Sequence, residues 1–283
     1  MDGEELTEQE TALYDRQIRV WGVDAQRRLS KSHILVSGMK GAVVEFCKNI
    51  VLAGIGSLTL MDNRPVTEEA LLSNFLIPPD EKMYSGRSLA ELCCDSLRDF
   101  NPMVHVSVEK GDLLSFDEDF YDKFDAVVVS CCSFTTKKQL DNTIECQLQY
   151  PSFEEAVAAP WRSLPKKVTK LYYAMRVIEG FEESEGRNPG EVSVSDLPSV
   201  LKMRNELCKA QSLTESHIPN GLLERLLLAG TSEYPPVCAI IGGILGQEVI
   251  KAISGKGDPL KNFFFFDAMD GKGIIEDISN SNH

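Results

Sequence analysis

The first half of the chain alternates short apolar runs with amphipathic stretches. His33–Ser37 and Ser57–Met61 are predicted to be buried strands, because continuous apolar runs of this length are typical of parallel sheets covered on both faces. Gly41–Ala53, followed by Gly54, has the pattern and the end signal of a helix. Further helices are predicted over 24–29 and 88–100, and further strands over 104–108 and 126–129. This alternation predicts an α/β fold, a doubly wound, Rossmann-like parallel sheet.

A helical segment precedes the first strand. Thr7 and Glu10 have the spacing of a capping box, which marks a helix start. Tyr14, Ile18 and Trp21 then fall on one face of a helix that ends at Gly22. We expect this apolar face to dock the helix on the rest of the chain.

The pattern changes after residue 132. Residues 142–149 alternate as a strand does, residues 152–155 form a second capping box, and helices are predicted over 165–183, 197–210 and 222–228. An apolar helix over 236–254 and a buried phenylalanine-rich strand over 262–267 follow. We therefore expect three segments: 1–135 as the first part of the sheet domain, 136–230 as a mostly helical insertion, and 231–283 as the return to the sheet domain.

Composition and charge exclude several classes of protein. The 29 basic and 43 acidic residues give a net charge of −14, which disfavours binding to nucleic acid or to an anionic membrane. The longest uninterrupted apolar run, 237–245, is far shorter than the roughly 20 residues of a membrane span. Eight cysteines and four histidines show no zinc-site spacing, so we expect reduced, buried thiols and no metal.

A strand, a glycine turn, a helix and a second strand ending in an aspartate form the frame of a dinucleotide or ATP site. Asp62 follows Gly38 by 24 residues, close to the distance expected for a ribose-binding carboxylate. A complete fingerprint needs glycine at 40 and 43, where the chain has Lys40 and Val43. Lys40 is either a phosphate ligand or a solvated side chain. The damaged pattern favours a vestigial site, which we assign to Gly38, Gly41 and Asp62.

The segment from Tyr14 to Gly22, YDRQIRVWG, resembles the opening of the adenylating domain in enzymes that activate ubiquitin-like proteins. The resemblance continues at the glycine turn and at Leu60-Met61-Asp62, resumes over 236–251 and closes with the strand over 262–267. The chain looks most like the family of smaller, Aos-type subunits of heterodimeric SUMO-activating enzymes, of plant type. This resemblance implies a ThiF/MoeB-like adenylation fold and a pseudo-enzyme that supports a catalytic partner.

The resemblance also implies which groups are missing. Catalytic members of the family follow Ser-Asn with Leu-Asn-Arg-Gln, whereas Ser73-Asn74 is followed here by Phe75-Leu76-Ile77. The family's Mg·ATP aspartate has no counterpart in the run from Cys131 to Phe134. The adjacent cysteines are expected to be core thiols and not a thioester nucleophile. We therefore expect no cofactor in this chain, with ATP and magnesium held by the partner.

By the same resemblance, Arg16 reaches in trans into the partner's ATP site, and Tyr14, Gln17 and Trp21 lie at the interface. A permanently charged, planar guanidinium can stabilise polyphosphate charge without a base or a metal. The plainer interpretation is that Arg16 and Arg19 are solvated or paired with acidic neighbours. The expected partners are the larger catalytic subunit and SUMO, across an interface of roughly 2,000 Å² or more. A nuclear location, with some protein in the cytoplasm, is implied by the resemblance alone.

The resemblance has one gap. Family members have another helix and strand after the fourth strand, whereas this chain runs directly from Cys132 to Leu140. Such a unit needs roughly 30 residues. We therefore expect a sheet that lacks a central block. Two other functions stay open, a stand-alone ATP-dependent adenylating enzyme of the ThiF/MoeB type and an NAD-dependent oxidoreductase.

Overall fold

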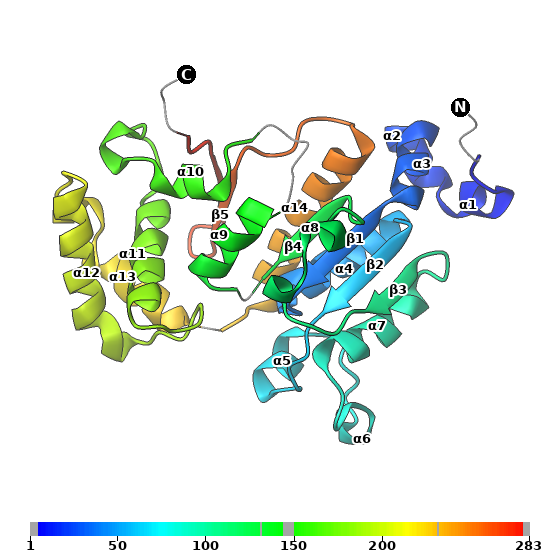
Figure 1. Ribbon diagram of the computed structural model, residues 1–283, viewed down its shortest axis with the longest axis horizontal. Helices are drawn as coiled ribbons and strands as arrows, with labels where there is room; N and C mark the ends of the chain where they lie inside the picture. Colours follow the sequence, from blue (N-terminus) through cyan, green and yellow to red (C-terminus); the bar gives the residue numbers. More distant parts are fainter. Residues whose placement is uncertain (1–4, 131, 144–149, 231, 280–283) are drawn as a thin grey trace. The chain divides into compact units, whose positions relative to one another are not determined.

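The computed structural model describes residues 5–130, 132–143, 150–230 and 232–279. The chain divides into two compact units, each with its own apolar core. Figure 1 shows the helices and strands of both units. Unit 1 comprises Met1–Ser130 and Glu233–Pro259, and unit 2 comprises Cys131–Ser232 and Leu260–His283. The segment predicted over 231–283 is therefore shared between the two units.

Unit 1 is built on a four-stranded parallel sheet with the order β3-β2-β1-β4. Ile34, Leu35 and Val36 point alternately to opposite faces of the sheet, and all three are 0% exposed. Both faces are therefore covered, as the continuous apolar runs predicted. The strands are β1 (His33–Ser37), β2 (Ser57–Met61), β3 (His105–Val108) and β4 (Ala126–Val129).

The predicted helices of unit 1 begin and end near the expected residues, except that the one expected to run up to Gly22 is divided in two at Tyr14. Ser88 caps the helix before β3 through a complete capping box with Glu91, and Thr7 and Glu10 cap the first helix in the same way. The helices are α1 (Glu8–Leu13), α2 (Asp15–Trp21), α3 (Val23–Lys31), α4 (Gly41–Ala53), α5 (Glu68–Ser73), α6 (Glu81–Tyr84), α7 (Leu89–Phe100), α8 (Glu118–Tyr121) and α14 (Pro235–Ser254), with a 3-10 turn at Leu113–Ser115. The short helices α5, α6 and α8 were not predicted.

Helix α14 packs closely along α4 and against α3. A Cβ atom on Gly242 would lie 2.5 Å from the carbonyl oxygen of Ala42, so only glycine permits this approach. Among the described residues α14 is the one helix long and apolar enough to cross a membrane, with a mean hydropathy of 1.5. The sequence analysis considered only the uninterrupted apolar run over 237–245, which is shorter than the helix that contains it. The absence of a membrane partner stays a prediction.

Unit 2 is a cluster of helices with one hairpin. Its core gathers Tyr172, Tyr173, Val177 and Phe181 from one helix with apolar residues of the others. The helices are α9 (Phe134–Thr143), α10 (Phe153–Ala158), α11 (Lys170–Ser184), α12 (Leu197–Ala210) and α13 (Asn220–Ala229), with 3-10 turns at Trp161–Ser163, Val194–Asp196 and Glu215–His217. The strands β5 (Phe263–Asp267) and β6 (Lys272–Glu276) form an antiparallel pair.

Three expectations about unit 2 need correction. Asn142 and Thr143 end α9 instead of beginning a strand, and 144–149 lie outside the described residues. Helix α11 begins at Lys170, because Thr169 and not Pro165 supplies its cap. The phenylalanine strand is only half-buried and pairs with β6, outside the parallel sheet. A run of four aromatic residues indicates a strand but does not show which sheet it joins.

Candidate functional site

The natural ligand site of this topology lies where the strand order reverses, between β1 and β4. Gly38 follows β1 with φ of +86°, and a Cβ atom there would lie 2.7 Å from the carbonyl oxygen of Ser130, which follows β4. Glycine is therefore required at 38 by the packing of two strand ends. The helix that follows, α4, begins at Gly41, and its N-terminal N–H groups are the donors that hold phosphate in nucleotide-binding relatives of this fold.

A carboxylate of the chain itself lies at this helix end. Glu233 accepts a hydrogen bond from the backbone N–H of Gly41 at 3.0 Å through one oxygen and from the Ser73 hydroxyl at 2.6 Å through the other. A Cβ atom on Gly41 would meet Cys238 Sγ at 2.9 Å and Ser73 Cβ at 3.2 Å. The start of α4 is thus covered by side chains of α5 and α14 and by the carboxylate of Glu233. The negative charge of Glu233 suits the positive N-terminal end of the helix dipole.

The carboxylate predicted to bind ribose is also engaged within the chain. Asp62 accepts the backbone N–H of Met39 at 2.7 Å and that of Arg64 at 3.1 Å. The Arg64 guanidinium adds two further bonds, at 2.9 and 2.6 Å, in a bidentate pair. Asp62 is 7% exposed. Its oxygens are occupied by the glycine turn and by Arg64, so none is left for a ribose hydroxyl.

Of the two changed positions of the fingerprint, Lys40 is the half-buried residue directly before α4, and Val43 serves packing. Val43, in place of the third glycine, is 5% exposed and belongs to the core of unit 1. Asn74 is 1% exposed, and its amide reaches the carbonyl of Met39 at 3.4 Å and the Cys93 sulfur at 3.3 Å. The structure brings Gly38, Gly41 and Asp62 together at one sheet edge, and their described contacts are internal to the chain.

The N-terminal motif lies against the opposite end of α4. Tyr14 is 2% exposed and packs on Gly54, the left-handed residue that ends α4. Gln17 donates to the carbonyl of Leu52 at 3.0 Å, and Trp21 donates to Gln26 at 3.0 Å. The side chain of Tyr14 is therefore covered by its own chain. The interface role of Tyr14, Gln17 and Trp21 stays a prediction.

The two arginines of the motif differ. Arg19 pairs with Asp15 at 2.9 Å, one helical turn away, and its side chain is 77% exposed. Arg16 is exposed, and its guanidinium makes no hydrogen bond or ion pair with any described residue. Its neighbour Asp15 is paired with Arg19, so the Arg16 guanidinium remains available to an external anion.

The buried thiols of α4 and α7 are poor nucleophiles. Burial raises the pKa of Cys93 to about 12 and raises the pKa of Cys94 and of Cys47 as well. Cys132 is 9% exposed, and Cys131 lies outside the described residues. Across the described ranges no group of three or more His, Cys, Asp or Glu side chains could hold a metal ion.

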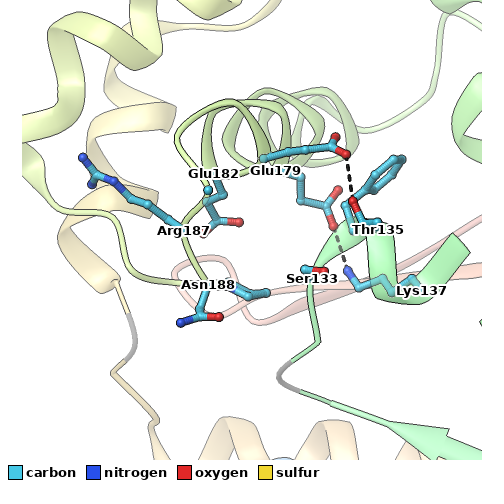
Figure 2. A pocket seen from close by; sticks show the side chains of 11 residues that line it. Ser133, Thr135, Lys137, Glu179, Glu182, Arg187 and Asn188 are labelled. Carbon is cyan, nitrogen blue, oxygen red and sulfur yellow. Dashed lines mark hydrogen bonds and ion pairs between the residues drawn. The ribbon is translucent and has the colours of Figure 1, made fainter. Parts of the chain in front are cut away.

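Unit 2 contains a cavity of about 260 Å³ between α9, α11 and the loop over 186–189. Lys137 Nζ donates to Glu179 at 2.9 Å, and Thr135 Oγ1 donates to Glu183 at 3.1 Å. Figure 2 shows Lys137 and Thr135 of α9 beside the glutamates of α11. Burial lowers the pKa of Lys137 and raises that of Glu182. The polar groups that line the cavity bind one another or the backbone. Lys137 pairs with Glu179, and Glu182 accepts the backbone N–H of Gly190. The cavity is therefore the weaker candidate.

The structure places in the site three residues that the sequence analysis did not single out. Glu233 lies 192 positions from Gly41 along the chain, and Asn101 lies 87 from Tyr14. Arg64 follows Asp62 by two residues, a local spacing that could have indicated the pairing. The other two contacts join residues far apart in the chain, so no local sequence pattern indicates them.

Comparison with known proteins identifies relatives along nearly the whole chain. The sequence matches the ThiF family over residues 14–283. It is 60% identical to SUMO-activating enzyme subunit 1B-1 of Arabidopsis thaliana, over 99% of each chain. It is 31% identical to SUMO-activating enzyme subunit 1 of Rattus norvegicus, over 96% of this chain and 95% of that one. The crystal structure of PaaA has a similar fold, with a TM-score of 0.58 and 15% identity over 98% of this chain and 76% of that one.

The alignment lengths also bear on the expected missing block. The Arabidopsis alignment runs over 319 positions, whereas this chain has 283 residues, so at least 36 positions have no residue here. The prediction of a shortened chain is confirmed. Its location after β4 stays a prediction, which the direct passage from Val129 to Phe134 supports.

Proposed function

Because this chain belongs to the ThiF family, and within it to the SUMO-activating enzyme subunit 1 group, we propose that it is the non-catalytic small subunit of a heterodimeric SUMO-activating enzyme. In this role it supports ATP-dependent adenylation of SUMO and the transfer of SUMO to a cysteine of the larger subunit. The larger subunit holds ATP and magnesium. By family resemblance the complex acts in the nucleus and partly in the cytoplasm.

One observation carries the non-catalytic assignment. The Gly41 N–H and the Asp62 carboxylate, which lie at the nucleotide position of the fold, are both hydrogen-bonded to other residues of the chain. Glu233 accepts the N–H of Gly41 where a phosphate oxygen would bind. Asp62 is bound by Met39 and Arg64 where a ribose hydroxyl would bind. A nucleotide would have to displace an internal anion and break a bidentate ion pair. The same contacts argue against a stand-alone adenylating enzyme and against an NAD-dependent oxidoreductase.

The exposed Arg16 is the residue through which this chain contributes to the reaction of the larger subunit. Arg16 stands on α2 without a partner among the described residues, whereas Arg19 is paired with Asp15. In the proposed complex Arg16 reaches the nucleotide of the larger subunit and stabilises negative charge as pyrophosphate leaves. Leu13 and Val20, three and four residues from Arg16, are 56% and 80% exposed. Apolar side chains around a free cation suit a surface that meets another protein.

ATP–pyrophosphate exchange tests the proposal. The isolated chain, the isolated larger subunit and the reconstituted heterodimer are each assayed with ATP, magnesium and SUMO. We expect no exchange above background from the isolated chain and SUMO-dependent exchange from the heterodimer. A parallel heterodimer, in which the missing positions are restored from the Arabidopsis relative, separates a failure of this shortened chain from a failure of the assignment. Exchange by the isolated chain would overturn the assignment.

A further inference from the structure

Three side-chain amides converge on the C-terminal end of α4. The carbonyl of Val51 accepts from Asn101 at 2.8 Å, that of Leu52 from Gln17 at 3.0 Å, and that of Ala53 from Gln26 at 2.9 Å. The last four carbonyls of a helix have no partner within the helix, and water usually supplies one. Here three successive carbonyls accept from side chains of three other places in the chain, and that of Val51 also accepts the backbone N–H of Gly54 at 3.1 Å. We refer to Gln17, Gln26 and Asn101 as the amide cap.

The amide cap connects α4 to the helix that carries Arg16. Gln17 belongs to α2 itself, and Gln26 to α3. Asn101 uses its second amide hydrogen to reach the Tyr14 hydroxyl at 2.8 Å, next to the start of α2. Trp21, the last residue of α2, donates through its indole N–H to the side-chain amide oxygen Oε1 of Gln26 at 3.0 Å. Helix α2 is therefore bound to the amide cap at its beginning, its middle and its end.

Helix α2 has limited apolar packing of its own. It has seven residues and none of them is fully buried, although the half-buried Trp21 packs against the core of unit 1. Tyr14, which precedes it, is buried, and its ring lies on Gly54. A short helix with so little apolar burial is not held by packing alone, because most helical stability in proteins comes from a buried face. Its position depends on the amide cap together with Tyr14 and Trp21.

We propose that Tyr14 and Gln17 are positioning residues for Arg16, and that the amide cap of α4 fixes the place from which Arg16 reaches the nucleotide of the partner. The inference rests on the proposed function. Arg16 lies between Tyr14 and Gln17 in sequence, so a shift of either anchor moves the guanidinium. A displacement of about 1 Å can cost on the order of 100-fold in rate when a group must meet a developing charge.

A double-mutant cycle in the reconstituted heterodimer tests the inference. Gln17→Ala removes one anchor, and the expected result is pyrophosphate exchange slowed about fivefold to tenfold, with the heterodimer still assembled in gel filtration. Gln9→Ala, an exposed glutamine on the neighbouring helix α1, is the matched control and should leave the rate within twofold. Tyr14→Phe removes the hydroxyl, keeps the ring on Gly54, and provides a second, milder variant should Gln17→Ala fail to assemble.

The combination with Arg16→Ala separates positioning from a structural effect. If Gln17 acts through Arg16, the double variant is no slower than Arg16→Ala alone, because there is no guanidinium left to misplace. A double variant slowed by the product of the two single effects would overturn the inference, as would a Gln17→Ala rate within twofold of wild type. An Arg16→Ala rate equal to wild type would instead remove the proposed role of Arg16, and the inference with it.

Discussion

The two ends of α4 face opposite kinds of side chain. At the N-terminal end the chain supplies an anion, Glu233, to the N–H of Gly41. At the C-terminal end it supplies neutral amide donors to the carbonyls of residues 51–53. Each choice suits the helix dipole, which favours negative charge at the start and hydrogen-bond donors at the end.

The contrast bears on which end of α4 is proposed to meet a ligand. At its start, Glu233 accepts the N–H of Gly41, a donor to which an external phosphate would bind in a nucleotide-binding relative. Near its other end, Arg16 has no ion-pair partner among the described residues. In the proposed complex the start of α4 therefore takes no part in nucleotide binding, and Arg16 supplies the functional group.

The largest effect is expected at Gly54. A Cβ atom there would lie 2.4 Å from the Tyr14 ring, and its φ is +80°. Gly54→Ala should cost about 2–4 kcal/mol from left-handed strain and overpacking. Thermal unfolding of Gly86→Ala is the control, since Gly86 also has positive φ but nothing within 4 Å. Equal losses of melting temperature in the two variants would show that Tyr14 does not pack on Gly54 as described.

The next largest effect is expected at Arg16. Arg16→Ala should slow pyrophosphate exchange by the heterodimer by about 10- to 100-fold, or about 1.4–2.7 kcal/mol in the barrier. Arg16→Lys should recover only part, because a point charge does not reproduce the guanidinium fork. Arg19→Ala serves as the control, since Arg19 is already paired with Asp15. A twofold change or less for Arg16→Ala, with normal assembly, would leave this chain a purely structural subunit.

Glu233→Ala should distinguish the contributions of the two ends of α4. The variant loses hydrogen bonds to Gly41 and Ser73, and we expect a loss of about 1 kcal/mol in unfolding free energy. The exchange rate of the heterodimer should stay within twofold, because this end takes no part in the reaction. A tenfold loss of rate in a heterodimer that assembles normally would mean that the start of α4 contributes to activity.

The smallest effect concerns Tyr14 at alkaline pH. Burial raises its pKa above the ordinary value near 10, so the unfolded chain loses this proton first. Stability from the protonated phenol is complete below a pH of about 10 and is lost as pH rises through the pKa of the folded state. The unfolding free energy, measured by urea titration at a series of pH values above about 10, should therefore fall more steeply with pH in the wild type than in Tyr14→Phe. Identical slopes would place the hydroxyl in water.

Local patterns predicted most of unit 1 because its elements have local end signals. Gly54 and Gly22 end helices as expected, and Thr7 and Ser88 begin them through capping boxes. The parallel order of β1 to β4 follows from alternation of strand and helix. Unit 2 was predicted less well, because the start of α11 and the pairing of β5 depend on tertiary contacts.

The candidate site was predictable in outline and not in its contacts. The sequence placed Gly38, Gly41 and Asp62 at one sheet edge, since the carboxyl ends of parallel strands meet there. It did not indicate that Glu233 occupies the start of α4, because the two segments are far apart in the chain. The amide cap was missed for the same reason, since buried glutamines and asparagines look like ordinary polar residues in a sequence.

The stoichiometry of nucleotide binding tests the central claim most directly. Mg·ATP is titrated by calorimetry into the reconstituted heterodimer and into the isolated chain at the same concentration. Because Glu233 accepts the N–H of Gly41 and Asp62 is bound by Met39 and Arg64, we expect one site per heterodimer and no heat of binding to the isolated chain. Two sites per heterodimer, or micromolar affinity in the isolated chain, would contradict it.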